Sequence, residues 1–84
     1  MVQLLYFARL KASLGVDSES VQLPASVTDL GGLVAWLRGR GGIWEEELAP
    51  GRPVRAAVNQ DMARPETPVR DGDEVAFFPP VTGG

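Results

Sequence analysis

The 84-residue sequence contains no cysteine and no histidine, and Lys11 is its one lysine. Without cysteine the chain can form no disulfide, thiolate zinc site or cysteine nucleophile. Without histidine it lacks the side chain that most often transfers protons near neutral pH. Catalysis by this chain alone would depend on carboxylates, hydroxyls and Lys11, so we look for a function in which the reacting groups belong to another protein.

Concentrated positive charge and long apolar runs are also missing. Eleven acidic and eight basic residues give a net charge of −3, and the basic residues are scattered along the chain. Nucleic acids bind clustered cations, so we expect no nucleic-acid partner. The longest apolar run, residues 4–8, is far shorter than a membrane span, and no signal segment follows Met1. We therefore expect a cytoplasmic protein without a membrane partner.

The chain is long enough for one small domain with a single core. Residues rich in β-branched and aromatic types predict strands at 2–8, 20–24, 54–58 and 74–78, with a short return strand at 62–63. Segment 9–15 predicts a helical turn closed by Gly15, and segment 43–48 a short helix with Trp44 and Leu48 turned inward. This order predicts a two-layer α+β domain over residues 1–78, with one main helix on one face of a small mixed sheet.

The main helix is predicted at 28–39. Its apolar residues recur at helical spacing, with Thr28 or Ser26 as the N-cap and Asp29 in the first turn. We interpret Gly31 and Gly32 as allowing the helix to pack close to the sheet.

Two acidic clusters are candidate metal or catalytic sites. Residues 45–47 are three consecutive glutamates, which fan around a helix instead of converging, and we expect a solvated face there. Residues 71–74 lack the ligand spacing of a calcium loop and predict a turn. The sequence therefore predicts no metal site.

Alternation along the first strand places Val2, Leu4, Tyr6 and Ala8 on one face. The opposite face also carries bulky side chains, those of Leu5 and Phe7. If Phe77 joins the core, then Phe78 lies outside with Leu5 and Phe7. These residues, with Met62 on the short strand, either complete the core or form a docking patch for a partner. We favour docking for Phe7 and Phe78 and leave both readings open for Leu5 and Met62.

The last eight residues read FFPPVTGG. Pro79 and Pro80 end the last strand and keep residues 79–84 extended, so this tail can reach roughly 20 Å into another protein. The small residues at its end bring little steric bulk. A carboxylate there becomes reactive if ATP activates it as an acyl-adenylate, and sulfur arriving at that carbonyl would give a nucleophilic thiocarboxylate.

Several segments together resemble the small, sulfur-carrier subunits of molybdopterin synthase, a family with the ubiquitin-like β-grasp fold. They are the opening VQLLYFARLK, the helix start at residues 28–30, Trp44, AAVNQ at 56–60 and above all DGDEVAFFPPVTGG from 71 onward. The resemblance covers essentially the whole chain.

The resemblance implies a role in molybdenum cofactor biosynthesis. In that role an ATP-dependent adenylating enzyme of the ubiquitin-activating type would activate Gly84, which follows Gly83, and Gly84 would become a thiocarboxylate. The tail would then deliver sulfur to cyclic pyranopterin monophosphate in the large synthase subunit. The small subunit would be the non-catalytic part of a heterotetrameric sulfurtransferase and would bind no cofactor, because ATP is used by the activating enzyme. The partner-binding residues would be Leu5, Phe7, Met62, Phe78, Pro79, Pro80, Val81 and Thr82.

Three other readings remain open. A sulfur carrier of thiamin biosynthesis shares the fold and the Gly-Gly ending. A ubiquitin-like modifier would be found attached to lysines of other proteins. An interaction module would use the tail only to dock.

Overall fold

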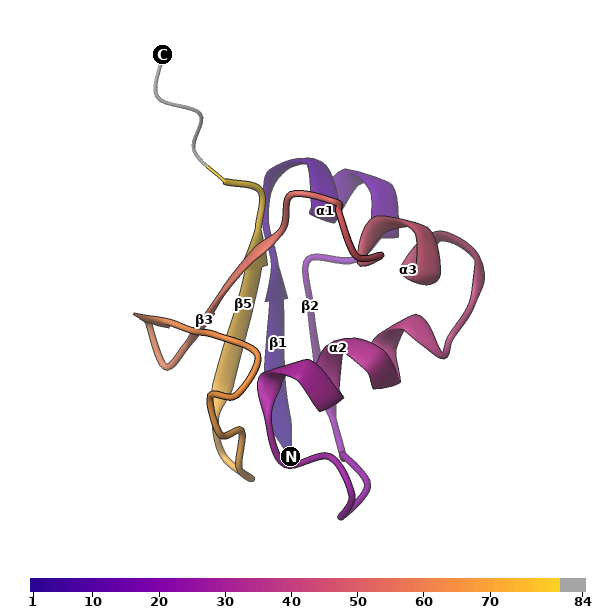
Figure 1. Cartoon of the computed structure of the whole chain (residues 1–84). Helices are drawn as coiled ribbons and strands as arrows, with labels where there is room; N and C mark the ends of the chain where they lie inside the picture. The colour runs from indigo at the N-terminus through magenta and orange to yellow at the C-terminus, as the bar shows by residue number, and fades with distance from the viewer. Residues whose placement is uncertain (81–84) are drawn as a thin grey trace.

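The computed structural model describes residues 1–80 and shows a five-stranded mixed sheet covered by three helices (Figure 1). In chain order the elements are β1 (Val2–Tyr6), α1 (Ala8–Leu14), β2 (Ser18–Val21), α2 (Leu30–Arg38), α3 (Gly42–Glu47), β3 (Arg55–Val58), β4 (Asp61–Met62) and β5 (Glu74–Phe78). The strand order is β2-β1-β5-β3-β4. Within residues 1–80 no helix is long and apolar enough to cross a membrane.

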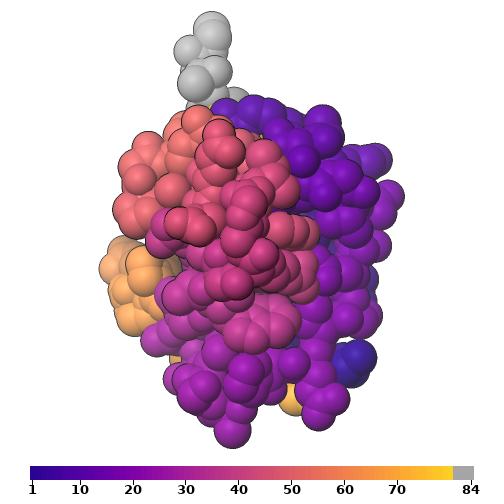
Figure 2. All heavy atoms as spheres, turned by 90° about the vertical axis from the view of Figure 1, so that its right-hand side faces the viewer, coloured from indigo at the N-terminus to yellow at the C-terminus, as the bar shows by residue number. Residues whose placement is uncertain are grey.

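The sheet is built around a parallel pair, β1 and β5, with antiparallel strands on either side. Its inner face meets the helices, which lie to the right of β3, β5 and β1 in Figure 1 and cover the face of the molecule shown in Figure 2. The most deeply buried side chains come from both layers and are Leu4, Tyr6, Leu10, Leu33, Leu37, Val75 and Phe77. The two-layer α+β expectation is confirmed.

Several strand boundaries differ from the expected ones. The first strand ends at Tyr6, because the chain turns into α1 with Ala8 at φ 54°, and Ala8 is exposed rather than part of the inner face. The second strand is 18–21 instead of 20–24, because its register on β1 pairs Val2 with Val21. The third strand begins at Arg55, the return strand is Asp61–Met62, and the last strand is found as predicted.

Helix α2 begins at Leu30, and its N-cap is Asp29 rather than Thr28 or Ser26. The Asp29 carboxylate accepts a hydrogen bond from the Gly32 N–H (2.7 Å), which satisfies one of the free donors of the first turn. Gly31 faces a loop and not the sheet: its N–H donates to the Pro65 carbonyl (2.8 Å), and a Cβ on Gly31 would lie 3.3 Å from that oxygen. The expected packing of the two glycines against the sheet is therefore wrong. A Cβ on Gly31 would meet the Pro65 loop, and a Cβ on Gly32 would lie 3.1 Å from the Asp29 carboxylate and close to Val27.

Helix α3 corrects the interpretation of the three glutamates. Glu45 and Glu46 are exposed as expected, whereas Glu47 is only 4% exposed. Its carboxylate accepts a hydrogen bond from Arg52 (2.5 Å) and lies 3.7 Å from the Arg9 Nε. Burial of a carboxylate requires such cationic partners, and they come from α1 and from the loop after α3, so the sequence around Glu47 does not reveal them.

Candidate functional site

The tail begins where the central strand β5 ends. Pro79 has no N–H to donate to a neighbouring strand, so the ladder stops at Phe78, as predicted. Pro79 and Pro80 are half-buried at the end of the sheet opposite the N-terminus, at the top of Figure 1. The predicted site residues Val81, Thr82, Gly83 and Gly84 lie outside the described residues.

The sheet face that points away from the helices carries a continuous apolar row. The strand register places Leu5 beside Ala76, Ala76 beside Ala57, and Ala57 beside Met62, so the row crosses four strands. Phe78 lies one step further along β5 on the same face, opposite Arg55. We call Leu5, Arg55, Ala57, Met62, Ala76 and Phe78, together with Phe7, the outer face.

The four apolar residues predicted as either core or docking patch all lie on this outer face and outside the buried core. Phe7 is 48% exposed and Met62 is 63% exposed, while Leu5 and Phe78 are half-buried. The backbone of Phe7 is extended, and its N–H donates to the Phe77 carbonyl (3.1 Å), so Phe7 continues β1 by one residue alongside Phe78. The structure therefore excludes core completion, and docking stays a prediction.

Three members of the outer face were not predicted as site residues. Ala57 and Ala76 are small and carry no chemistry, yet they connect Leu5 to Met62. Arg55 places a cation next to Phe78. Alternation along each strand could have assigned these residues to a face, but only the register between strands shows that they are neighbours.

A polar network on the inner side fixes the ends of β1 and β5. The Tyr6 hydroxyl donates to Glu19 (2.9 Å), which also accepts two hydrogen bonds from Arg40 (both 2.9 Å). The Arg40 guanidinium lies 4.4 Å from the ring centre of Trp44, and the Tyr6 ring stacks on Phe77 at 5.8 Å. Burial raises the pKa of Tyr6, and the hydrogen bond from Arg40 lowers the pKa of Glu19. The network holds Phe77, and with it the strand that leads into the tail.

This network predicts a pH dependence of stability. The pKa of Glu19 is lower in the folded protein than its ordinary value of 4.5, so its interactions stabilise the fold fully above that pH. The contribution is lost as the pH falls through the folded-state pKa. We expect Arg40→Met to lower the free energy of unfolding at pH 7, and to lower it by progressively less as the pH falls below 4.5. Urea unfolding of both proteins over a series of pH values below 7 measures this, and a difference that stays constant down to acid unfolding would contradict the prediction.

Residues 1–80 contain no group of three or more His, Cys, Asp or Glu side chains placed to hold a metal ion. The acidic 71–74 segment forms a turn, with Gly72 at φ 91° and the Asp73 carboxylate accepting hydrogen bonds from Arg70 and Asn59. The outer face, beside the base of the tail, remains the predicted docking surface.

Comparison with known proteins identifies similar proteins over nearly the whole chain. Residues 4–84 match the ThiS family. The chain is 38% identical to the molybdopterin synthase sulfur carrier subunit of Escherichia coli (strain K12) over 84 residues, which is 100% of both chains. Its structure resembles the putative molybdopterin converting factor, subunit 1, of Pyrococcus furiosus, with a TM-score of 0.78 and 30% identity over 95% of this chain and 97% of that one.

A third relative was solved in a complex. It is a chain of the protein–protein complex of subunits 1 and 2 of the molybdopterin-converting factor from Helicobacter pylori 26695. It matches with a TM-score of 0.66 and 26% identity over 99% of this chain and 97% of that one. The likenesses confirm the expected ubiquitin-like β-grasp fold. Because the family match extends over nearly all of its residues, the chain belongs to the ThiS family.

Proposed function

We propose that this protein is the sulfur carrier subunit of a molybdopterin synthase, and that the carboxylate of Gly84 carries the sulfur. The observation that carries the proposal is the alignment with the Escherichia coli sulfur carrier subunit, which spans 100% of both chains and so includes the Gly-Gly ending. The outer face adjoins the base of the tail, which suits a protein that presents its tail to a partner.

The proposed chemistry takes place at a single carbonyl. The Gly84 carboxylate attacks the α-phosphate of ATP on the adenylating enzyme, giving an acyl-adenylate and releasing pyrophosphate. A sulfur donor at the oxidation level of hydrosulfide then attacks the carbonyl, AMP leaves, and one proton is released. The product is a thiocarboxylate in which sulfur replaces one oxygen. Its anionic sulfur is the nucleophile that attacks cyclic pyranopterin monophosphate, and hydrolysis restores the carboxylate.

The partner that receives the tail is proposed to be the large subunit of the synthase. The Helicobacter pylori relative is described as subunit 1 in complex with subunit 2, which supports a partner of this kind. The surface offered to it is the outer face, with Phe7 and Phe78 next to the tail base and Leu5 and Met62 further along the row. Since the chain has no cysteine or histidine, we assign the groups that act on ATP and on the pterin to the partner proteins.

The direct test is the intact mass of the protein after incubation with its adenylating enzyme, ATP and sulfide. We expect a gain of about 16 Da, the difference between sulfur and oxygen, located at Gly84 by fragmentation. Omitting ATP is the control and should give no gain. An unchanged mass with a stable large-subunit complex would reject the carrier role and favour a protein whose tail only docks. Transfer of the sulfur to the pterin precursor in the presence of the large subunit then separates this pathway from thiamin synthesis.

A further inference from the structure

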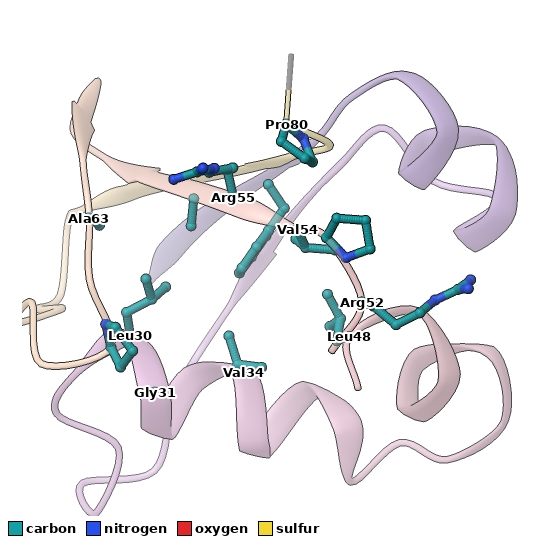
Figure 3. A pocket seen from close by; sticks show the side chains of 13 residues that line it. Leu30, Gly31, Val34, Leu48, Arg52, Val54, Arg55, Ala63 and Pro80 are labelled. Atoms are coloured by element: carbon teal, nitrogen blue, oxygen red, sulfur yellow. The ribbon is translucent and has the colours of Figure 1, made fainter. Parts of the chain in front are cut away.

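Among the residues of the outer face, Arg55 is the one that carries a charge. It is exposed and lies opposite Phe78 in the pairing of β3 with β5. Arg55 and Pro80 also line the same groove beside β3, and both lie on the side of β3 away from α2 in Figure 3. A cation is therefore placed at the base of the tail, among the aromatic and apolar residues that are predicted to dock.

The fold supplies no counter-charge to Arg55 within residues 1–80. The ion pairs of arginine side chains there are Arg9 with Glu47, Arg40 with Glu19 and Arg52 with Glu47. The acidic residues of the neighbouring strands lie at the other end of the sheet. Asp61 is opposite Val58, which is about 10 Å from Arg55 along β3, and Glu74 begins β5 at the end far from Phe78.

A second arginine lies beside Arg55 at the edge of the sheet. The pairing of β3 with β4 extends beyond β4, because the Ala63 N–H donates to the Ala56 carbonyl (3.0 Å). Continuing this register by one residue brings Arg64, which is exposed, next to Arg55. In the part of the chain that the structure describes, Arg64 also forms no ion pair. Like charges on neighbouring strands destabilise a sheet, so an anion from outside the fold would relieve this repulsion.

Docking through Phe78 would remove water from Arg55 as well, because the two residues are neighbours. A charge that is buried at an interface without a counter-charge strongly weakens binding. The planar guanidinium matches a carboxylate, which can accept two parallel hydrogen bonds from it. A partner that covers Phe78 is therefore expected to place a carboxylate against Arg55.

We propose that the large synthase subunit presents an aspartate or glutamate side chain to Arg55 and Arg64 when it binds the outer face, which makes Arg55 a specificity-determining residue of the complex. This inference rests on the proposed function, since it names the chemistry of the partner surface that receives the tail. A protein carboxylate suits the site better than nucleic acid does. Two cations beside an apolar row, on a chain with a net charge of −3, are too few to neutralise a run of phosphates.

The test measures the affinity of the full chain for the large subunit by isothermal titration calorimetry. We expect Arg55→Glu to weaken binding by at least about a hundredfold, because it brings two carboxylates together. Arg55→Gln should weaken binding by at least about tenfold, and Arg55→Lys by less, because lysine keeps the charge. Raising the NaCl concentration from about 0.1 M to about 0.5 M should weaken binding of the unaltered chain and strengthen binding of Arg55→Glu, because salt screens attraction and repulsion alike.

The matched control is Arg70→Glu, which gives the same net charge as Arg55→Glu. Arg70 is exposed and precedes the 71–74 turn, which leads into the end of β5 far from Phe78. Its charge reversal should change the affinity by less than about twofold. Circular dichroism checks the folding of each variant. Arg64→Glu supplies a second charge reversal at the edge of the sheet and should also weaken binding, so the test does not depend on the folding of Arg55→Glu alone.

Four outcomes would overturn the proposal. The first is an affinity of Arg55→Glu within about twofold of that of Arg70→Glu. The second is tighter binding by Arg55→Glu, which would show that the facing surface is basic. The third is an equal loss for the lysine, glutamine and glutamate variants of Arg55, which would assign the effect to packing. The fourth is no binding by the unaltered chain, which would reject the large subunit as the partner, while sulfur loading of Gly84 still tests the carrier role separately.

Discussion

Adding one alanine after Gly84 will abolish formation of the thiocarboxylate and leave the folded domain intact. The extra residue moves the terminal carboxyl by ~3.5 Å and replaces it at its former position with an amide carbonyl. Acyl-adenylate formation requires the carboxylate oxygen in line with the α-phosphate, and a displacement of about 1 Å can cost a hundredfold in rate. The amide that replaces the carboxylate is no nucleophile. We therefore expect a loss of at least about a hundredfold in adenylation.

The measurement is the intact mass after incubation with the adenylating enzyme, ATP and sulfide. The matched control carries the same extra alanine between Ala25 and Ser26, two exposed residues of a turn remote from the tail. Both variants have the same composition and mass, so a difference between them reports only the position of the added residue. Normal sulfur loading of the extended tail would show that the reacting group is not the Gly84 carboxylate.

The end of the last strand was predictable because its determinants are local. Pro79 ends β5 through the chemistry of proline alone, and alternation along five residues assigns Phe77 to the core and Phe78 to the outer face. The same reasoning separates Leu4 from Leu5 in β1. These assignments require no knowledge of contacts with distant segments of the chain, and the structure confirms them.

The errors occurred where a residue depends on another part of the chain. The second strand was placed two residues too late, because the register of β2 is set by β1 and not by its own composition. Glu47 was expected in solvent, because its partners Arg9 and Arg52 come from other segments. Gly31 was assigned to the wrong neighbour, since the Pro65 loop reaches α2 only in the folded chain.

The outer face depends on the register between strands. Ala57 and Ala76 become part of a surface only when β5 lies between β1 and β3. Single-sequence patterns give the face on which a residue lies, whereas contacts between distant strands determine what that face can bind.

Phe78→Ala is expected to weaken binding to the large synthase subunit by at least about thirtyfold, the effect of losing an interface hot spot worth 2 kcal/mol or more. Phe78 is the last residue of β5 and lies beside Phe7 directly before the tail, so insertion of the tail would bring both rings into the centre of the interface. Aromatic residues at a desolvated centre contribute most of the binding energy, and residues at the rim contribute little. Met62 is on the edge strand β4, so Met62→Ala should cost less than Phe78→Ala.

Isothermal titration calorimetry of each variant with the large subunit measures these differences, and Ile43→Ala is the matched control. Ile43 is an exposed apolar residue (39%) on α3, in the helix layer rather than on the outer face, so its removal should leave the affinity unchanged. Phe78 is half-buried, so circular dichroism at the titration temperature must show that Phe78→Ala is folded. Equal affinities for Phe78→Ala and Ile43→Ala would remove the outer face from the interface and leave the tail alone to hold the partner. A graded loss, largest at Phe78 and smallest at Met62, would place the centre of the interface at the base of the tail, where the chain delivers Gly84.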